Sequence, residues 1–430
     1  MHPVKEILRN NKTAQYALYS VCTANPLAIK AAVRHAKKHG YVLVIEATAN
    51  QVNQDGGYTG MKPADYMALV KGILEEEGLS TDRVILGGDH LGPLTWQNLP
   101  EDEAMSRAEE LVKSYVLAGF TKIHIDTSMR VASDDPKAPL DVRVCARRGA
   151  RLAHCVEKAY QQLLAENPNA IRPVLVIGSE VPVPGGSQEH EDSITPTSPE
   201  EFRRQYRVFR EEFEAAGISF DDVVAFVVQP GVEFGDDFVF QYNREKARSL
   251  TEALRDYFPV VFEGHSTDYQ SQDSLKKMTE DGIRILKVGP ALTFALREAL
   301  LLAEEIEEIL IPDPGRRSGF RKALLGEMDR DSRYWKKYYS GTPDEISYKK
   351  LYSFSDRCRY YLPAEPVQSS IDILLGNLEN IPVALISQYF PRQYEKVMAG
   401  QLSSDCLSVI LDRIGYWCDI YAAACGVRLD

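Results

Sequence analysis

Short apolar runs recur along the first 310 or so residues of the chain, and each is followed by a polar stretch and then by a helical pattern. The run YVLVIEAT at 41–48 is one example, and the helical stretch PADYMALVKGILEEEG follows it after a glycine-rich loop. Nearly continuous apolar runs rich in β-branched residues are typical of parallel strands covered on both faces. The predicted strands span residues 14–22, 41–48, 83–90, 122–128, 172–180, 223–231, 259–266 and 283–290.

Eight regular strand–helix units predict an α/β fold of the (β/α)8 TIM-barrel type. A doubly wound open sheet is the alternative, but the first strand–helix turn lacks the GxGxxG pattern, and such a sheet usually contains fewer units. From the segment IPDPGRRSG at 311–319 onward, the pattern changes to tyrosine-rich, helix-like segments without clear strands. We therefore predict a barrel over residues 1–310 and a helical C-terminal region over residues 311–430.

Composition narrows the class of protein. Of the 430 residues, 44% are hydrophobic and 26% are charged, as in soluble globular proteins. The net charge of −12 argues against nucleic acid or an anionic membrane as the main partner, although a local basic pocket could still bind a small anion. We find no apolar run as long as a membrane span and no signal-peptide pattern. The seven cysteines are scattered without CxxC spacing, which indicates reduced thiols in a cytoplasmic protein.

Polar side chains gather where the predicted strands end, which is where barrels of this type carry their chemistry. The segment VILGGDHLGP at 84–93 starts as a strand, breaks at two glycines and delivers Asp89 and His90 side by side. Side chains alternate along a strand, so the pair His124 and Asp126 shares one face, as does the pair Glu263 and His265. Further polar residues at strand ends are Glu46, Thr48, Asn50, Gln51, Glu180, Gln229, Glu233, Ser266, Asp268 and Lys287.

Burying several carboxylates and histidines around one barrel mouth is costly unless a cation compensates them. A divalent metal, with zinc as first choice, is the simplest compensation, because it binds both imidazole nitrogen and carboxylate oxygen. We expect His90 and His265 as imidazole ligands because both lie at strand tips, and Glu180 and Glu233 as carboxylate ligands. No short motif such as HExxH supports the site, so this prediction rests on position alone.

Several of these residues also have a simpler interpretation. His124 lies deep on its strand and could be a core histidine bonded to a backbone carbonyl. Asp89 could cap a helix, and Glu46 could be a structural acid that orients nearby loops. His35 and His39 lie beside lysines on a charged helix and are expected to be solvated. The tyrosines of the C-terminal region are expected to serve in packing and at interfaces.

The strand ends also resemble a known family. The segments IEATANQVNQDGGYTGMKPAD, ILGGDHLGP, AGFTKIHIDTSM, GSEVPVPGG, VVQPGVEFGD, EGHSTDYQ and ILKVGPALTFALREAL look like those of the Z subunit of class II D-tagatose-1,6-bisphosphate aldolase, a family often labelled tagatose-6-phosphate kinase. The match runs from about residue 19 to about residue 400. The resemblance implies a (β/α)8 barrel with a helical C-terminal part. It also implies an oligomer and a role in supporting a catalytic Y subunit.

The family is distantly similar to the zinc-dependent class II aldolases, and this similarity implies roles for single residues. Asp89 and His90 match an Asp-His pair that supplies the acid/base and one metal ligand. Asp126 and Glu180 match acidic positions on the next two strands. The segment QPGVEFG has no histidine at the second ligand position, and FEGHS has glutamate at the third, with its histidine displaced by two. The resemblance therefore implies an altered metal site.

Two functions follow from the resemblance. One is a Z subunit in ketohexose or galactitol-type sugar metabolism. The other is a freestanding, metal-dependent ketohexose 4-epimerase that interconverts fructose and tagatose by retro-aldol and aldol chemistry, as some Z-like proteins do. An ATP-dependent kinase is not expected, because the sequence has no GxxxxGK[ST] loop and no kinase signature. We expect catalytic roles for Asp89, Asp126, Glu180, Glu263 and Asp268, and contacts with a ketohexose or its phosphate from Glu46, Asn50, Gln229, Ser266 and Lys287.

Phosphate recognition is a further expectation. Barrels of this type often bind phosphate with the loops after strands 7 and 8. Here Ser266, Thr267 and the backbone amides near Gly289 could serve. Arg333 or Arg357 from the C-terminal region could close over the mouth.

Overall fold

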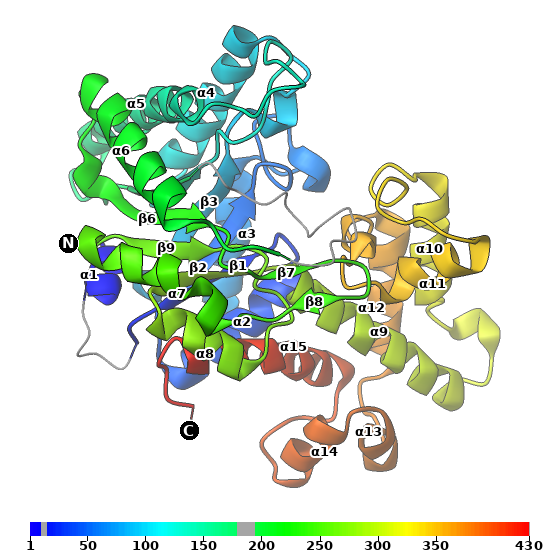
Figure 1. The fold of residues 1–430 in the computed structure, drawn as a ribbon. Helices are drawn as coiled ribbons and strands as arrows, with labels where there is room; N and C mark the ends of the chain where they lie inside the picture. The colour runs from blue at the N-terminus through cyan, green and yellow to red at the C-terminus, as the bar shows by residue number, and fades with distance from the viewer. Residues whose placement is uncertain (10–14, 179–193, 430) are drawn as a thin grey trace.

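Eight parallel strands close into a barrel in the computed structural model, which describes residues 1–9, 15–178 and 194–429 (Figure 1). The predicted (β/α)8 fold is confirmed, and each of the eight predicted runs overlaps one strand. The last strand of the barrel pairs with the first, with Leu18 opposite Ile285. The strands are β1 Leu18–Cys22, β2 Leu43–Thr48, β3 Val84–Leu91, β4 Lys122–Ile125, β5 Val174–Ile177, β6 Val223–Val228, β9 Val261–Gly264 and β10 Ile283–Val288.

A helix follows each barrel strand, and local sequence signals set where these helices begin and end. In the first of them, the side chain of Asn25 accepts hydrogen bonds from two backbone N–H groups of the first turn, and Pro26 occupies the first helical position. Gly40 ends the same helix in the left-handed conformation. The helices are α2 Pro26–His39, α3 Pro63–Glu77, α4 Glu101–Leu117, α5 Val142–Glu166, α6 Pro199–Ala215, α7 Arg244–Ala253, α8 Gln272–Glu280 and α9 Pro290–Leu310.

The barrel interior is apolar at one end and charged at the other. A short helix that the sequence analysis did not predict, α1 Pro3–Arg9, closes the apolar end with Val4 and Leu8. These two side chains belong to one apolar cluster with Leu18, Val44, Ile85, Val174, Val176, Val224, Ala225, Val227, Val261 and Ile285. Because the N-terminal end of the barrel is plugged in this way, access to the interior is from the carboxyl ends of the strands.

The C-terminal region is helical, as predicted, and its last helix returns to the barrel. Helix α15 packs against α2, α8 and α9 (Figure 1). The Tyr421 hydroxyl donates to the backbone carbonyl of Thr267. The helices of this region are α10 Phe320–Arg330, α11 Pro343–Tyr352, α12 Glu365–Asn377, α13 Val383–Tyr389, α14 Pro391–Met398 and α15 Cys406–Ala424. A small hairpin after β6, formed by β7 Glu233–Phe234 and β8 Val239–Phe240, was not predicted.

The packing of α15 corrects one prediction. His35 is buried rather than solvated, since its ring nitrogens lie 2.8 Å from the Tyr41 hydroxyl and 2.7 Å from an Asp419 carboxylate oxygen of α15. The pattern of α2 alone cannot show that a helix almost 400 residues later covers this face. All seven cysteines are free thiols, as predicted. Within the described residues, the structure contains no helix with the length and apolar character that a membrane span requires.

Candidate active site

Asp89 and His90 both face the barrel mouth because β3 leaves the regular strand conformation at its end. Consecutive strand residues normally point to opposite faces. His90, however, has a left-handed backbone with φ of 51°, and the pairing of β3 with β4 shifts register between Gly88 and Leu91. Asp89 does not cap a helix, since the 3-10 helix that follows (Pro93–Trp96) is preceded by Gly92. A strained non-glycine residue of this kind often marks a functional site.

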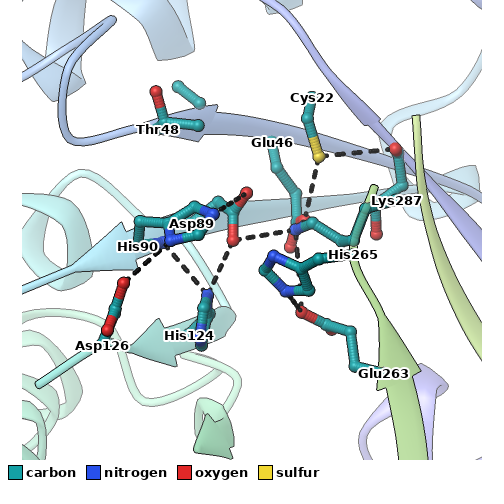
Figure 2. A network of polar contacts seen from close by, with 12 residues as sticks. Cys22, Glu46, Thr48, Asp89, His90, His124, Asp126, Glu263, His265 and Lys287 are labelled. Carbon is teal, nitrogen blue, oxygen red and sulfur yellow. Dashed lines mark hydrogen bonds and ion pairs between the residues drawn. The ribbon is translucent and has the colours of Figure 1, made fainter. Parts of the chain in front are cut away.

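Three imidazole rings gather at this mouth, from His90, His124 and His265. Their ring centroids lie 4.8 to 5.1 Å apart, and all three rings are buried (Figure 2). One potential ligand atom from each histidine and one from Asp89 lie within 4.8 Å of one another. His124, with Nδ1 2.7 Å from Asp89 Oδ1, therefore bonds to a carboxylate and not to a backbone carbonyl as the simpler interpretation held.

A carboxylate orients each of the three rings. Asp126 Oδ2 lies 2.9 Å from His90 Nδ1, and Glu263 Oε1 lies 2.9 Å from His265 Nε2. With Asp89 beside His124, each ring has one nitrogen bonded to a carboxylate. Metal-binding histidines in proteins are commonly held in this way, with the carboxylate fixing the tautomer and the ring orientation.

The residues present fit a divalent metal. His124 Nε2 is buried and has no hydrogen-bond partner in the described part of the chain. The backbone N–H of His90 also lies 3.1 Å from Nδ1. In the tautomer that donates Nδ1–H to Asp89, the Nε2 atom carries a lone pair that a cation beside it would satisfy. Charge leads to the same conclusion, because the described residues of the site place four buried carboxylates against two lysines and one histidine, His90, whose pKa is raised by Asp89 and Asp126 against the effect of burial. The carboxylates and lysines are Glu46, Asp89, Asp126, Glu263, Lys122 and Lys287.

A layer of paired charges lies directly beneath the histidines. Lys122 Nζ lies 2.7 Å from Glu46 Oε1 and 2.7 Å from Glu263 Oε2. Lys287 contacts Glu46 closely and lies 3.0 Å from Asp89 Oδ1 (Figure 2). Gly87 makes room for this layer, because a Cβ at its position would lie 2.3 Å from Glu46 Oε1. The ion pairs connect the barrel interior to Asp89 and so hold its carboxylate in place.

These contacts set the ionisation of the site at neutral pH. Burial opposes the charge of Asp89, but Lys287 and His90 hold the pKa of its carboxyl well below the usual range. Burial similarly opposes the charge of Asp126, yet its bond with His90 lowers its pKa to about 2. Burial lowers the pKa of His265 to about 4, which leaves this ring neutral and able to bind a metal.

A cavity of about 80 Å³ opens above the cluster, several times the roughly 10–15 Å³ that one water needs. Its walls include Asn50, Ser266 and Lys287, all three of which were expected to contact substrate. Arg359 and Tyr360 from the C-terminal region complete the rim. The remaining lining residues are Cys22, Thr48, Gln51, Tyr58, Asp89, His90, Phe234, His265, Asp268, Val288, Gly289 and Pro290.

Other expected residues lie away from this cluster. The Glu233 carboxylate accepts the N–H of Phe234, and its oxygens do not lie among the converging ligand atoms. The Gln229 side chain accepts two backbone N–H groups of its own loop. Glu46 is fully buried in the charged layer and does not line the cavity. Glu180, expected both as a catalytic residue and as a ligand, lies outside the described residues.

Two arginines expected to close over the mouth line a neighbouring cavity instead. Arg333 and Arg357 lie in a space of about 510 Å³ that shares Asn50, Tyr58 and Tyr360 with the mouth. Arg359 takes the position at the mouth itself. No sequence pattern predicts this choice, because the short turn Arg357–Tyr360 has no periodicity and is placed by tertiary contacts.

Sequence reasoning also missed Lys122 as a site residue and undervalued His124. A signal was present, since Lys122, His124 and Asp126 alternate along a single strand and must share one face. Three polar residues pointing into a barrel need partners there. The same reasoning that selected Asp126 could therefore have selected all three.

Comparison with known families agrees with this geometry. A family model described as D-tagatose-1,6-bisphosphate aldolase subunit GatZ/KbaZ-like matches residues 4–426. The chain belongs to this family. The match covers both the barrel and the C-terminal helices, so the resemblance drawn from the strand ends is confirmed over nearly the whole chain.

The GatZ/KbaZ-like chain is similar to several solved structures, at both high and low sequence identity. A protein from Sinorhizobium meliloti 1021, described as a probable tagatose 6 phosphate kinase, is 40% identical with a TM-score of 0.85, over 95% of this chain and 100% of that one. The fructuronate-tagaturonate epimerase UxaE from Cohnella laeviribosi is 14% identical with a TM-score of 0.46, over 98% of this chain and 84% of that one. A fructose-bisphosphate aldolase from Campylobacter jejuni is 14% identical with a TM-score of 0.39, over 84% and 87%.

Proposed function

We propose that this GatZ/KbaZ-like chain carries out metal-dependent aldol chemistry on a ketohexose or its phosphate, with inversion at C4 as its reaction. The observation that carries the proposal is the buried group of His90, His124, His265 and Asp89, in which each imidazole is oriented by a carboxylate. A barrel that served only as a scaffold would gain nothing from keeping this costly arrangement buried.

His90, His124 and His265 would hold the metal, and zinc or another divalent ion suits this donor set. When bound, such an ion supplies Lewis-acid polarisation of a ketose carbonyl. In this proposal Asp126 and Glu263 orient the rings of His90 and His265. Glu180 remains a proposed catalytic residue or ligand from the sequence.

Asp89 is the proposed base. Its carboxylate lines the cavity and is ionised at neutral pH, and Lys287 at 3.0 Å stabilises that charge. Asp89 would accept the proton of the C4 hydroxyl while the C3–C4 bond breaks and its electron pair moves toward the C2 carbonyl oxygen. The resulting aldehyde turns over within the cavity, the C3–C4 bond re-forms on its other face, and Asp89 returns the proton.

The rim would hold the sugar during this step. Asn50 and Ser266 can exchange hydrogen bonds with sugar hydroxyls, and Arg359 brings a positive charge to the wall of the cavity. Retention of the two fragments distinguishes epimerisation from net cleavage, and the residues contributed by the C-terminal region would serve this retention by covering the mouth.

A second candidate function is support of a catalytic Y subunit, favoured by the family description as an aldolase subunit. The two functions are distinguished with the purified chain alone. Loaded with zinc, it is incubated with D-tagatose, D-fructose and their 6-phosphates, and C4 epimers and three-carbon products are quantified. The proposal predicts epimers that disappear in His124→Ala but persist in His154→Ala, an exposed histidine of α5. No turnover by the metal-loaded wild-type chain would overturn it and favour the supporting role.

A further inference from the structure

The loop that follows β9 fills the position where a barrel of this type would bind a phosphate group. Phosphate commonly binds such barrels at the loops after strands 7 and 8 and at a helix N-terminus beside them. In this chain those strands are β9 and β10, and the helix is α9, which begins at Pro290 after Gly289. The Asp268 side chain reaches across from the β9 loop to this helix N-terminus.

The amides at the start of α9 are all engaged. Asp268 Oδ1 accepts the backbone N–H of Gly289 at 3.0 Å and that of Ala291 at 2.8 Å. Pro290 has no N–H to offer. The next two N–H groups, of Leu292 and Thr293, donate to the carbonyl of Gly289. A carboxylate of the protein thus receives the two hydrogen bonds that an incoming phosphate would need.

Thr267, a second phosphate ligand expected from the sequence, is also occupied. The Thr267 hydroxyl donates to the carbonyl of Lys287 and lies 3.1 Å from the Tyr421 hydroxyl. Asp268 itself is buried, and it lines the mouth cavity. A phosphate at this end of the cavity would have to expel the carboxylate or accept a like charge beside it.

We infer that Asp268 is a specificity-determining residue that keeps phosphate away from the α9 end of the cavity and reserves that end for an uncharged terminus of the sugar. Both of its backbone bonds go to Oδ1, so Oδ2 can accept a hydrogen bond from a ligand hydroxyl. The ligand class is a ketose with a free hydroxymethyl group at that end. Any phosphate it carries lies at the opposite end, so a ketohexose bisphosphate is a poor ligand whichever way round it binds.

This inference rests on the proposed function in one respect, namely that the cavity binds a ketose. The experiment therefore has two arms on the full-length, zinc-loaded chain. Calorimetry first measures the binding of inorganic phosphate to the wild type and to two variants. Asp268→Gly removes the carboxylate from the start of α9, and Asp268→Asn keeps an acceptor oxygen at the same place. Calorimetry then compares D-tagatose 1,6-bisphosphate with the two D-tagatose monophosphates.

The inference predicts that Asp268→Gly binds inorganic phosphate about tenfold or more tightly than the wild type, the effect of two hydrogen bonds to a charged acceptor, and that Asp268→Asn does not. It also predicts that the wild type binds one monophosphate at least about tenfold more tightly than the bisphosphate, and that Asp268→Gly narrows this difference. Equal phosphate binding by all three proteins, or a wild type that prefers the bisphosphate, would overturn it. If no sugar binds any of the proteins, the proposed function fails, and the inorganic phosphate arm alone decides the role of Asp268.

Discussion

Removing the amino group of Lys122 tests whether the charged layer beneath the histidines supports the barrel. Lys122 is fully buried, and its Nζ lies 2.7 Å from carboxylate oxygens of both Glu46 and Glu263. Burial lowers its pKa, but these two carboxylates more than reverse that effect, so Lys122 is charged in the folded chain. The substitution Lys122→Met keeps most of the volume and removes only the charge and its hydrogen bonds.

The expected cost is large because two buried carboxylates lose a partner together. Breaking a buried ion pair from one side typically costs about 3–5 kcal/mol, since the remaining charge is left uncompensated. Lys287 offsets part of this loss through its contact with Glu46 and its 3.8 Å distance to Glu263. We therefore expect the free energy of unfolding to fall by about 3 kcal/mol, the lower end of that range.

Urea denaturation of the metal-free chain measures this change, with Lys113→Met, an exposed lysine of α4, as the control that should shift stability by less than about 0.5 kcal/mol. In the double variant Lys122→Met, Glu263→Gln the surplus charge is also removed. The double variant should therefore lose roughly 1–3 kcal/mol less free energy of unfolding than the two single variants lose together. A loss below about 1 kcal/mol for Lys122→Met, or additive behaviour of the pair, would refute the reasoning.

Three further predictions follow from single contacts. Gly87→Ala places a Cβ 2.3 Å from Glu46 Oε1 and should destabilise the chain by about 1–3 kcal/mol in the same urea assay; a neutral effect would show that the charged layer can shift freely. Burial lowers the pKa of His2 to about 4, and its Nδ1 accepts the N–H of Val4. The pKa of His2 in the folded chain lies below its value in the unfolded chain. The contribution of His2 to the free energy of unfolding is therefore fully present above about pH 6.5, and about 3 kcal/mol of it is lost as the pH falls toward 4. His2→Asn should flatten this part of the pH–stability curve, and an unchanged curve would contradict the assignment. The Thr293 hydroxyl donates to Asp356 at 2.7 Å, and Asp356 precedes the turn that carries Arg359. Asp356→Ala should therefore loosen this turn and, in the epimerisation assay with the ketohexose substrate, raise KM about tenfold with little change in kcat. A fall in kcat alone would argue against this role.

Much of the fold could be predicted from the sequence because each barrel strand is a continuous apolar run with its own helix. Such a pattern is local, so it can be recognised in the sequence without knowledge of tertiary contacts. The elements that were missed lack it. Helix α1 has seven residues and is stabilised by plugging the barrel, and the β7–β8 hairpin has two residues in each strand.

In the candidate site, too, the residues that could be predicted are those with a local signal in the sequence. Asp89, His90 and His265 were selected because strand ends of a barrel converge by construction. The position of Arg359 depends on how the C-terminal region folds over the mouth, which no periodicity encodes. The role of Asp268 likewise depends on a contact with another loop, at the start of α9.

Zinc binding by the purified chain tests the central claim most directly. The chain is stripped with a chelator and titrated with Zn²⁺ and, as a spectroscopic probe, Co²⁺. We expect one tightly bound ion for each chain, with affinity reduced about 10- to 100-fold in Asp126→Ala, which leaves His90 without its orienting carboxylate. We also expect a greater loss in His124→Ala and no change in His154→Ala. A wild-type chain that binds no ion, or binding that His90→Ala, His124→Ala and His265→Ala all leave unchanged, would contradict the metal centre.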